Sequence, residues 1–137
     1  MSETSAQTRV VYESTVTAVG GQVEAFLDHN LLIFFADESP AELHEMSVRH
    51  RATVAEEGPQ TGDTIVLGEQ SMEVLAVGSV VGDNLLNLGH IDIKANGLTT
   101  AKLPGDANVA KQKLALPSPG DAFRIIRGNR PTTEEPT

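Results

Sequence analysis

The chain has 137 residues, enough for one domain with a hydrophobic core and little room for a second. Its net charge of −9 would repel a nucleic-acid backbone and an anionic membrane surface, and it suits a partner with a basic face. Aromatic residues make up only 4%, which predicts an aliphatic core, and the absence of cysteine excludes disulfides, thiolate catalysis and cysteine-based zinc sites.

The two ends of the chain are poor in apolar residues. Residues 1–7 lack the basic start and apolar centre of a signal peptide, and no apolar run approaches the roughly 20 residues that span a bilayer. We therefore expect a cytoplasmic protein without direct membrane insertion. Residues 1–7 and 128–137 are expected to be disordered tails around a single domain over residues 8–127.

Between the tails, the sequence predicts many short strands separated by turn signals such as Gly20-Gly21, Asn96-Gly97 and Pro104-Gly105. Short helical segments are expected at 22–28, from Ser39-Pro40, and at 84–88. Without a long amphipathic helix, this pattern predicts an all-β fold, a single antiparallel barrel-like or sandwich domain with one or two short helical turns. The predicted strands are residues 9–19, 31–35, 47–54, 64–67, 72–77, 90–95, 98–103 and 122–127.

The strand predicted at 47–54 carries a histidine where a small apolar residue would be typical. With a period of two, His50 shares a face with Val48 and Ala52, whereas Arg49 and Arg51 lie on the opposite face, towards solvent, unless a bulge intervenes. An imidazole among aliphatic neighbours tends to be neutral, and a neutral imidazole with one exposed nitrogen can accept a phosphoryl group. Filling space in the core is the plain alternative. The acidic residues that bracket this strand suit either solubility or docking of a basic partner.

Other signals are weaker. His90 stands at the start of a predicted strand and would assist His50 if the sheet brought the two rings together. Backbone amides and side chains of the loop with Ser79 and Asn84 are candidates for lining a phosphate pocket. No glycine-rich loop has the spacing of a nucleotide-binding motif, and the histidines lack the spacing of a metal site, so no metal or cofactor is expected.

A more specific pattern runs through the middle of the chain. Residues 77–90 read Val-Gly-Ser-Val-Val-Gly-Asp-Asn-Leu-Leu-Asn-Leu-Gly-His, after Leu31-Leu32-Ile33-Phe34 and Pro40-Ala41-Glu42-Leu43 and before Asn96-Gly97-Leu98 and Leu103-Pro104-Gly105. With these motifs, from about Val11 to Ile126, the chain resembles the glucitol/sorbitol-specific IIA components of the phosphotransferase system.

The resemblance implies a cytoplasmic phosphocarrier. Such proteins accept a phosphoryl group from a phosphohistidine of an HPr-like carrier protein and pass it to the IIB domain of the membrane permease (IIB/IIC) during glucitol/sorbitol uptake. The family's phosphorylated histidine falls on His50, counted from the Pro-Ala-Glu-Leu motif, and His90 matches the histidine of its Leu-Gly-His motif. We expect His50 as the nucleophile and His90 as its orienter or hydrogen-bond donor.

One position departs from the family pattern. Members carry a second histidine two residues after the phosphorylated one, where this chain has Ala52. That histidine is dispensable, its task has moved, or this protein has drifted away from sugar uptake. Two alternatives to a carrier therefore stay open: a non-catalytic regulatory or ligand-binding β module, and a small β domain whose histidines are structural.

Overall fold

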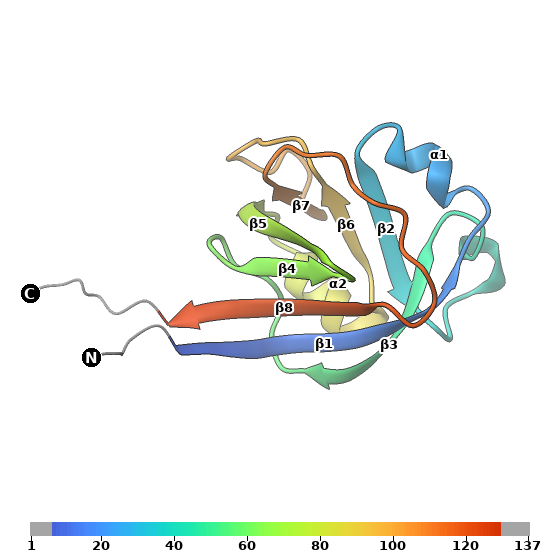
Figure 1. Cartoon of the computed structure of the whole chain (residues 1–137), viewed down its shortest axis with the longest axis horizontal. Helices are drawn as coiled ribbons and strands as arrows, with labels where there is room; N and C mark the ends of the chain where they lie inside the picture. The colour runs from blue at the N-terminus through green and yellow to red at the C-terminus, as the bar shows by residue number, and fades with distance from the viewer. Residues whose placement is uncertain (1–6, 130–137) are drawn as a thin grey trace, which may run out of the picture.

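The computed structural model describes residues 7–129, so the tails expected at 1–6 and 130–137 lie outside the described residues. The expectation that Gln7 and residues 128–129 belong to the tails was wrong. The first strand begins at Gln7 and the last strand ends at Asn129, because these two residues pair with each other and continue the ladder. Figure 1 shows these two strands side by side.

Over residues 7–129 the chain forms a closed barrel of eight strands, in the order β1-β3-β2-β6-β7-β5-β4-β8. The all-β prediction is confirmed, and so are the short helical segments (Figure 1). The strands are β1 (Gln7–Val19), β2 (Leu31–Ala36), β3 (Val48–Ala55), β4 (Thr64–Leu67), β5 (Gln70–Val77), β6 (Ile91–Lys94), β7 (Asp106–Val109) and β8 (Ala122–Asn129). The helices are α1 (Val23–Leu27), the 3-10 turn η2 (Ala41–Leu43) and α2 (Val81–Leu88).

The barrel is not wholly antiparallel. The pairs β2–β3 and β6–β7 run parallel, whereas the other pairs are antiparallel as expected. Each parallel pair is joined by an extended crossover, residues 37–47 and residues 95–105, since a tight hairpin cannot link parallel strands. The sequence patterns mark the strands but carry no information on their direction.

One predicted strand is absent and another was missed. Residues 98–103 form a loop whose carbonyl groups at Leu98 and Thr100 accept hydrogen bonds from the Asn108 side chain. Asn108 belongs to β7, a fully buried strand that the sequence analysis did not recognise because Asp106 and Asn108 interrupt its apolar pattern. Asp106 is satisfied by Lys94, whose Nζ lies 3.0 Å from its carboxylate.

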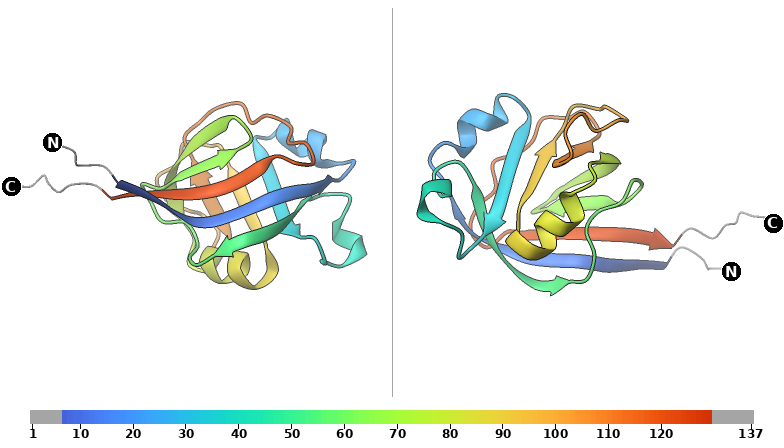
Figure 2. Two further views of the ribbon diagram at one scale, coloured as in Figure 1. Left: turned by 60° about the horizontal axis from the view of Figure 1, so that its bottom comes forward. Right: turned by 180° about the vertical axis from the view of Figure 1, so that it is seen from behind.

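The pairing of β3 leaves part of this strand without a neighbour on one edge. Its register with β2 covers three residue pairs and ends at Ala36 opposite His50. Beyond His50, β3 continues to Ala55 with β1 on one edge and no strand on the other. Helix α2 packs against β2 and β6, and Figure 2 shows it on the side of the barrel close to β3. Within residues 7–129 no helix is long and apolar enough to cross a membrane.

Candidate active site around His50

His50 lies inside the barrel wall, with only 2% of its surface exposed. It pairs with Val16 on β1 and with Ala36 on β2. The predicted alternation holds for Val48 and His50, which are both buried. It fails at Ala52, which is exposed, because the register between β1 and β3 shifts next to this residue and β2 no longer covers the strand.

Both ring nitrogens of His50 have hydrogen-bond partners. Nε2 lies 2.7 Å from the Gly89 carbonyl oxygen, and Nδ1 lies 2.7 Å from the Ser14 hydroxyl. A carbonyl oxygen only accepts, so Nε2 carries the proton, and in the neutral ring Nδ1 then accepts from the Ser14 hydroxyl. The expectation of one exposed nitrogen is therefore wrong for this arrangement.

Aromatic rings surround the imidazole. The ring centroids of Tyr12, Phe34 and Phe123 lie 6.0, 5.4 and 5.6 Å from that of His50. The chain has only four Phe and one Tyr, so more than half of its aromatic residues gather here, and the core is not purely aliphatic as predicted. Loss of hydration in this setting lowers the pKa of His50 below its usual value, which the Gly89 hydrogen bond opposes only in part. His50 is thus a neutral, fixed imidazole.

A pocket of about 240 Å³ adjoins His50 on the open edge of β3. Gly89, the partner of Nε2, borders this pocket, whereas Ser14, the partner of Nδ1, does not. The pocket therefore borders the residue that binds Nε2 and not the residue that binds Nδ1. The burial of Tyr12, which also borders the pocket, raises its pKa to about 12 and keeps its hydroxyl protonated. The lining residues are Tyr12, Ala36, Glu38, His50, Arg51, Ala52, Ala55, Leu85, Leu86, Asn87 and Gly89.

The carbonyl that binds Nε2 is presented by the end of α2. Gly89 follows the last turn of this helix with φ at +65°, a left-handed conformation that favours glycine. A Cβ on Gly89 would also lie 2.6 Å from the backbone nitrogen of Ala36. The Leu-Gly-His motif therefore contains a glycine that lets α2 end directly against β2, above the imidazole of His50.

Arg51 was expected in solvent on the far face of β3, and 72% of its side chain is exposed. It also borders the same pocket as His50. The absence of a neighbouring strand beyond His50 leaves this edge open, so residues from both faces of β3 reach the pocket. The guanidinium of Arg51 donates to Asp37 at 2.7 Å. Asp37 also accepts from the Thr17 hydroxyl at 2.7 Å and lies 3.9 Å from the guanidinium of Arg49. These partners, the Thr17 hydroxyl foremost, hold the pKa of Asp37 below its usual value.

The structure does not bring His90 into this site. Its ring stacks on Phe35 with centroids 4.3 Å apart, and its Nε2 lies 3.0 Å from an Asp92 carboxylate oxygen. Phe35 follows the inward-facing Phe34 on β2 and is more exposed, so His90 packs on the outer side of the barrel wall. His90 does not border the pocket, although its neighbour Gly89 does. None of its contacts gives it the role of orienting His50.

Ser79 and Asn84 also lie away from the pocket. Ser79 is exposed in the turn before α2, and the backbone of Asn84 takes part in the hydrogen bonds of that helix. The pocket adjoins the opposite end of α2, where Leu85, Leu86 and Asn87 face it. The loop before α2 has a structural role instead. The backbone of Gly78 packs so closely against Pro104 that a Cβ at position 78 would lie 2.2 Å from the Pro104 carbonyl oxygen.

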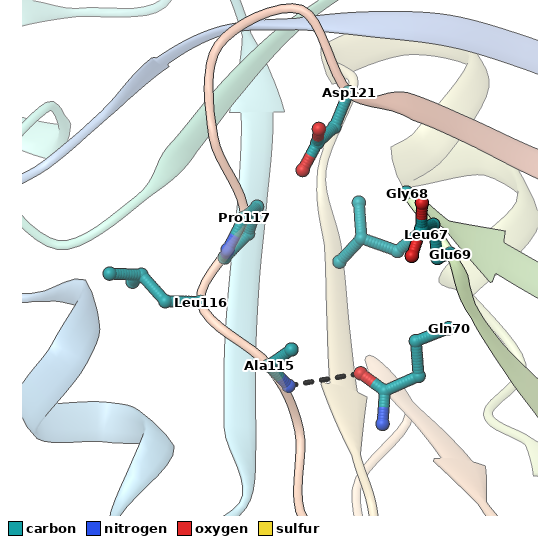
Figure 3. Close-up of a pocket in the computed structure, with 8 residues that line it drawn as sticks. All are labelled: Leu67, Gly68, Glu69, Gln70, Ala115, Leu116, Pro117 and Asp121. Carbon is teal, nitrogen blue, oxygen red and sulfur yellow. Dashed lines mark hydrogen bonds between the residues drawn. The ribbon is translucent and has the colours of Figure 1, made fainter.

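A larger cavity, about 580 Å³, lies elsewhere (Figure 3). It separates the β4–β5 hairpin from the segment that leads into β8, and Gln70 spans it by accepting the Ala115 backbone N–H at 2.9 Å. Its charged residues are Glu69 and Asp121, both acidic, and it contains no histidine. This cavity therefore lacks the chemistry of a phosphate site. Residues 7–129 also contain no cluster of three possible metal ligands.

The sequence did not reveal the hydrogen-bond partners of His50, Ser14 and Gly89, or the neighbouring ring of Tyr12. A signal was available for Ser14, which falls at an inward position of a strand rich in Val and Thr, where a polar side chain needs a partner. Gly89 acts through its carbonyl group, which no side-chain pattern reveals. Tyr12 is the one tyrosine of the chain.

Comparisons with known proteins agree with this geometry. A model of the family "PTS system glucitol/sorbitol-specific IIA component" matches residues 11–124. Glucitol/sorbitol-specific EIIA components of Shigella flexneri and of Escherichia coli K12 are each 36% identical over 116 residues, which is 85% of this chain and 94% of each relative. The crystal structure of a PTS system IIA component from Enterococcus faecalis V583 has a TM-score of 0.70 at 18% identity, covering 81% of this chain and 96% of that one.

Proposed function

This chain belongs to the glucitol/sorbitol-specific IIA components of the phosphotransferase system, and from that premise we propose that it carries its phosphoryl group on His50. Members of this family are phosphotransferase components. The observation that carries the assignment is a neutral imidazole, fixed at both nitrogens, with a pocket that the residue binding Nε2 borders. Phosphoryl transfer asks a protein for such positioning more than for covalent machinery.

The phosphoryl group comes from a phosphohistidine of an HPr-like carrier and leaves to the IIB domain of a glucitol/sorbitol permease. In the first step the lone pair of Nε2 attacks phosphorus and the N–P bond of the donor breaks, so the donor imidazole leaves with that electron pair. Each ring keeps one N–H proton, and the step needs no external acid, base or metal. The second step is the same exchange with His50 as the donor.

Ser14 lets His50 change tautomer. In the resting arrangement Nε2–H donates to the Gly89 carbonyl and Nδ1 accepts from the Ser14 hydroxyl. Attack by Nε2 requires that this nitrogen leave Gly89 and lose its proton to solvent while Nδ1 takes one up, so that the ring keeps one proton and carries it on Nδ1. The Ser14 hydroxyl oxygen then accepts a hydrogen bond from Nδ1–H, because a hydroxyl both donates and accepts. Ser14 is thus a positioning residue that serves both states of the ring.

The charge of the molecule supports docking of basic partners in the cytoplasm. Three exposed glutamates lie on the crossover between β2 and β3, Glu38, Glu42 and Glu45, and Glu38 borders the pocket. A partner with a positive surface around its own phosphorylation site would be steered to this region, and salt would weaken the encounter. His90, with Ser79 and Asn84, has no place in this mechanism beyond supporting the ends of α2.

A second candidate function deserves a test because both nitrogens of His50 are occupied. A regulatory β module that keeps the fold without passing on phosphate would show this same closed arrangement. The two functions differ in onward transfer. A carrier is labelled and then emptied by the IIB domain, whereas a regulatory module is not labelled or keeps its label.

The experiment is incubation with labelled phosphoenolpyruvate, the general enzyme of the system and HPr. We expect acid-labile, base-stable label on the wild-type chain, its loss in His50→Gln, and its persistence in the matched control His90→Gln. Added IIB domain should remove the label. Label that survives His50→Gln contradicts the assignment, and label that IIB does not remove favours the regulatory module.

A further inference from the structure

We propose that Arg51 is the side chain that binds the phosphoryl group on His50, and that Asp37 holds it ready beside the pocket. The inference rests on the proposed function and adds a residue to it. Both residues lie at the point where β2 leaves β3, since the backbone N–H of Asp37 donates to the His50 carbonyl at 3.0 Å.

The pocket has a simple charge composition. Among the residues that border it, Arg51 is the only cation and Glu38 the only anion, with His50 neutral. A phosphoryl group adds about two negative charges. Glu38 and the carbonyl end of α2 oppose that charge. Arg51 is therefore the group within the pocket that can offset it, and it need not be supplied by the partner.

Arg51 is held loosely enough to move. Its side chain is 72% exposed, and its hydrogen bond to Asp37 joins one guanidinium nitrogen to one carboxylate oxygen. Exposed pairs of this kind contribute at most about 1 kcal/mol. Arginine presents two parallel donors to a phosphate, so it gains a second hydrogen bond when it exchanges Asp37 for the phosphoryl oxygens.

Asp37 does not become unpaired when Arg51 leaves. It keeps the Thr17 hydroxyl at 2.7 Å, and the guanidinium of Arg49 lies 3.9 Å away. Arg49 does not border the pocket, so the two arginines have separate tasks: Arg49 stays with Asp37, and Arg51 exchanges. Asp37 therefore keeps two of its three partners when Arg51 turns to the phosphoryl group.

The positive charge of Arg51 would stabilise the transition state of phosphoryl transfer. In a loose transition state the charge spreads over the three equatorial oxygens of the phosphoryl group. Arg51 neutralises that charge while the N–P bond of the donor breaks and the bond to Nε2 forms. It takes up no proton and forms no bond, so the balance of the step is unchanged.

The test compares single-turnover transfer from phosphorylated HPr to wild type, Arg51→Gln, Arg51→Lys and Arg124→Gln. Arg124 is the matched control, because it forms a similar surface pair with Glu13 at 2.8 Å and does not border the pocket. We expect Arg51→Gln to slow the maximal rate about 10- to 100-fold, since removing one positioned donor from a transition state costs that much or more. Arg51→Lys should recover part of the rate, and Arg124→Gln should match wild type.

A second variant tests the role of Asp37. Asp37→Asn removes the carboxylate that holds Arg51 beside the pocket and should slow the maximal rate, by less than Arg51→Gln does. In the double variant Asp37→Asn/Arg51→Gln the rate should equal that of Arg51→Gln alone, because Asp37 acts through Arg51, whereas a merely structural cluster would give additive losses. The ³¹P resonance of the phosphohistidine should shift in Arg51→Gln and not in Arg124→Gln.

Equal rates and equal ³¹P shifts in wild type and Arg51→Gln would overturn the inference while leaving His50 as the phosphorylated residue. Failure of the proposed function is distinguishable, because it would appear as label that persists in His50→Gln.

Discussion

Two of the clusters that pair a carboxylate with an arginine differ in how far they are enclosed. Asp63 has 4% of its side chain exposed and Arg127 has 16%; two hydrogen bonds of 3.0 and 2.8 Å join them. Asp37 is 28% exposed and Arg51 72%, and one hydrogen bond joins them. The enclosed pair ties β8 to the turn before β4, whereas the open pair borders the pocket. We therefore expect the enclosed arginine–carboxylate pair to stabilise the fold and the exposed pair to let its arginine exchange partners.

The largest expected effect lies in the enclosed cluster. Arg127→Gln leaves Asp63 buried without its partner and also removes the hydrogen bonds to Glu57 and the Gly58 carbonyl. The free energy of unfolding should fall by about 3 kcal/mol, as it does when a buried pair loses one member. Denaturant titration measures this. Full transfer activity at a temperature where the variant is folded would agree with a structural role of Arg127. A fall in the free energy of unfolding of less than about 1 kcal/mol would contradict the difference between the enclosed and the exposed pair.

Ser14→Ala tests the buried hydrogen bond between Ser14 and His50. It removes the hydroxyl from Nδ1 of His50, a buried acceptor whose loss of a partner costs about 1–3 kcal/mol. Transfer from HPr should also slow, because the product tautomer loses the acceptor for its Nδ1 proton. Thr53→Ala is the control, since its hydroxyl makes an exposed contact of 3.4 Å to the Glu13 carbonyl. Equal stability and equal rates in both variants would contradict the role of Ser14.

The pH dependence of stability follows from the lowered pKa of His50. The unfolded chain binds a proton on this residue below its ordinary pKa of about 6.5, whereas the folded chain does so only at lower pH. The free energy of unfolding should therefore fall as the pH drops below about 6.5, by up to about 1.4 kcal/mol per pH unit from this group. His50→Gln should lack this component. Identical pH slopes in wild type and variant would show that His50 titrates normally.

The smallest effect on stability belongs to the open cluster. Arg51→Gln should change the free energy of unfolding by less than about 1 kcal/mol, because the pair is exposed. The comparison thus predicts opposite outcomes for two arginines: Arg127 affects stability and Arg51 affects transfer. A loss of stability in Arg51→Gln as large as that in Arg127→Gln would contradict it.

The fold class and the position of His50 could be predicted because they depend on local patterns. Alternating strands, turn residues and the motif around Pro40 are visible along the chain. Strand direction and β7 could not be predicted, because parallel pairing depends on crossovers and because Asp106 finds its partner, Lys94, on another strand. The barrel is a consequence of contacts between distant segments.

The site itself was predicted only in part. His50 stays the proposed nucleophile, but its hydrogen-bond partners Ser14 and Gly89 were not predicted, because they come from β1 and from the end of α2, which are far from it in sequence. His90 was chosen for its motif, yet that motif places Gly89, not His90, against the imidazole. Arg51 was expected in solvent, and its side chain is indeed mostly exposed. Regular pairing did not predict that the open edge of β3 also brings it to the pocket.

NMR of the histidine side chains before and after phosphorylation by HPr shows which ring nitrogen carries the phosphoryl group. We expect that Nε2–H of His50 is replaced by a phosphorus coupling to Nε2, that a proton is then found on Nδ1, and that the His90 ring shows no phosphorus coupling. A phosphorus coupling to His90, or a phosphorylated protein in which the His50 ring is unchanged, would contradict this expectation.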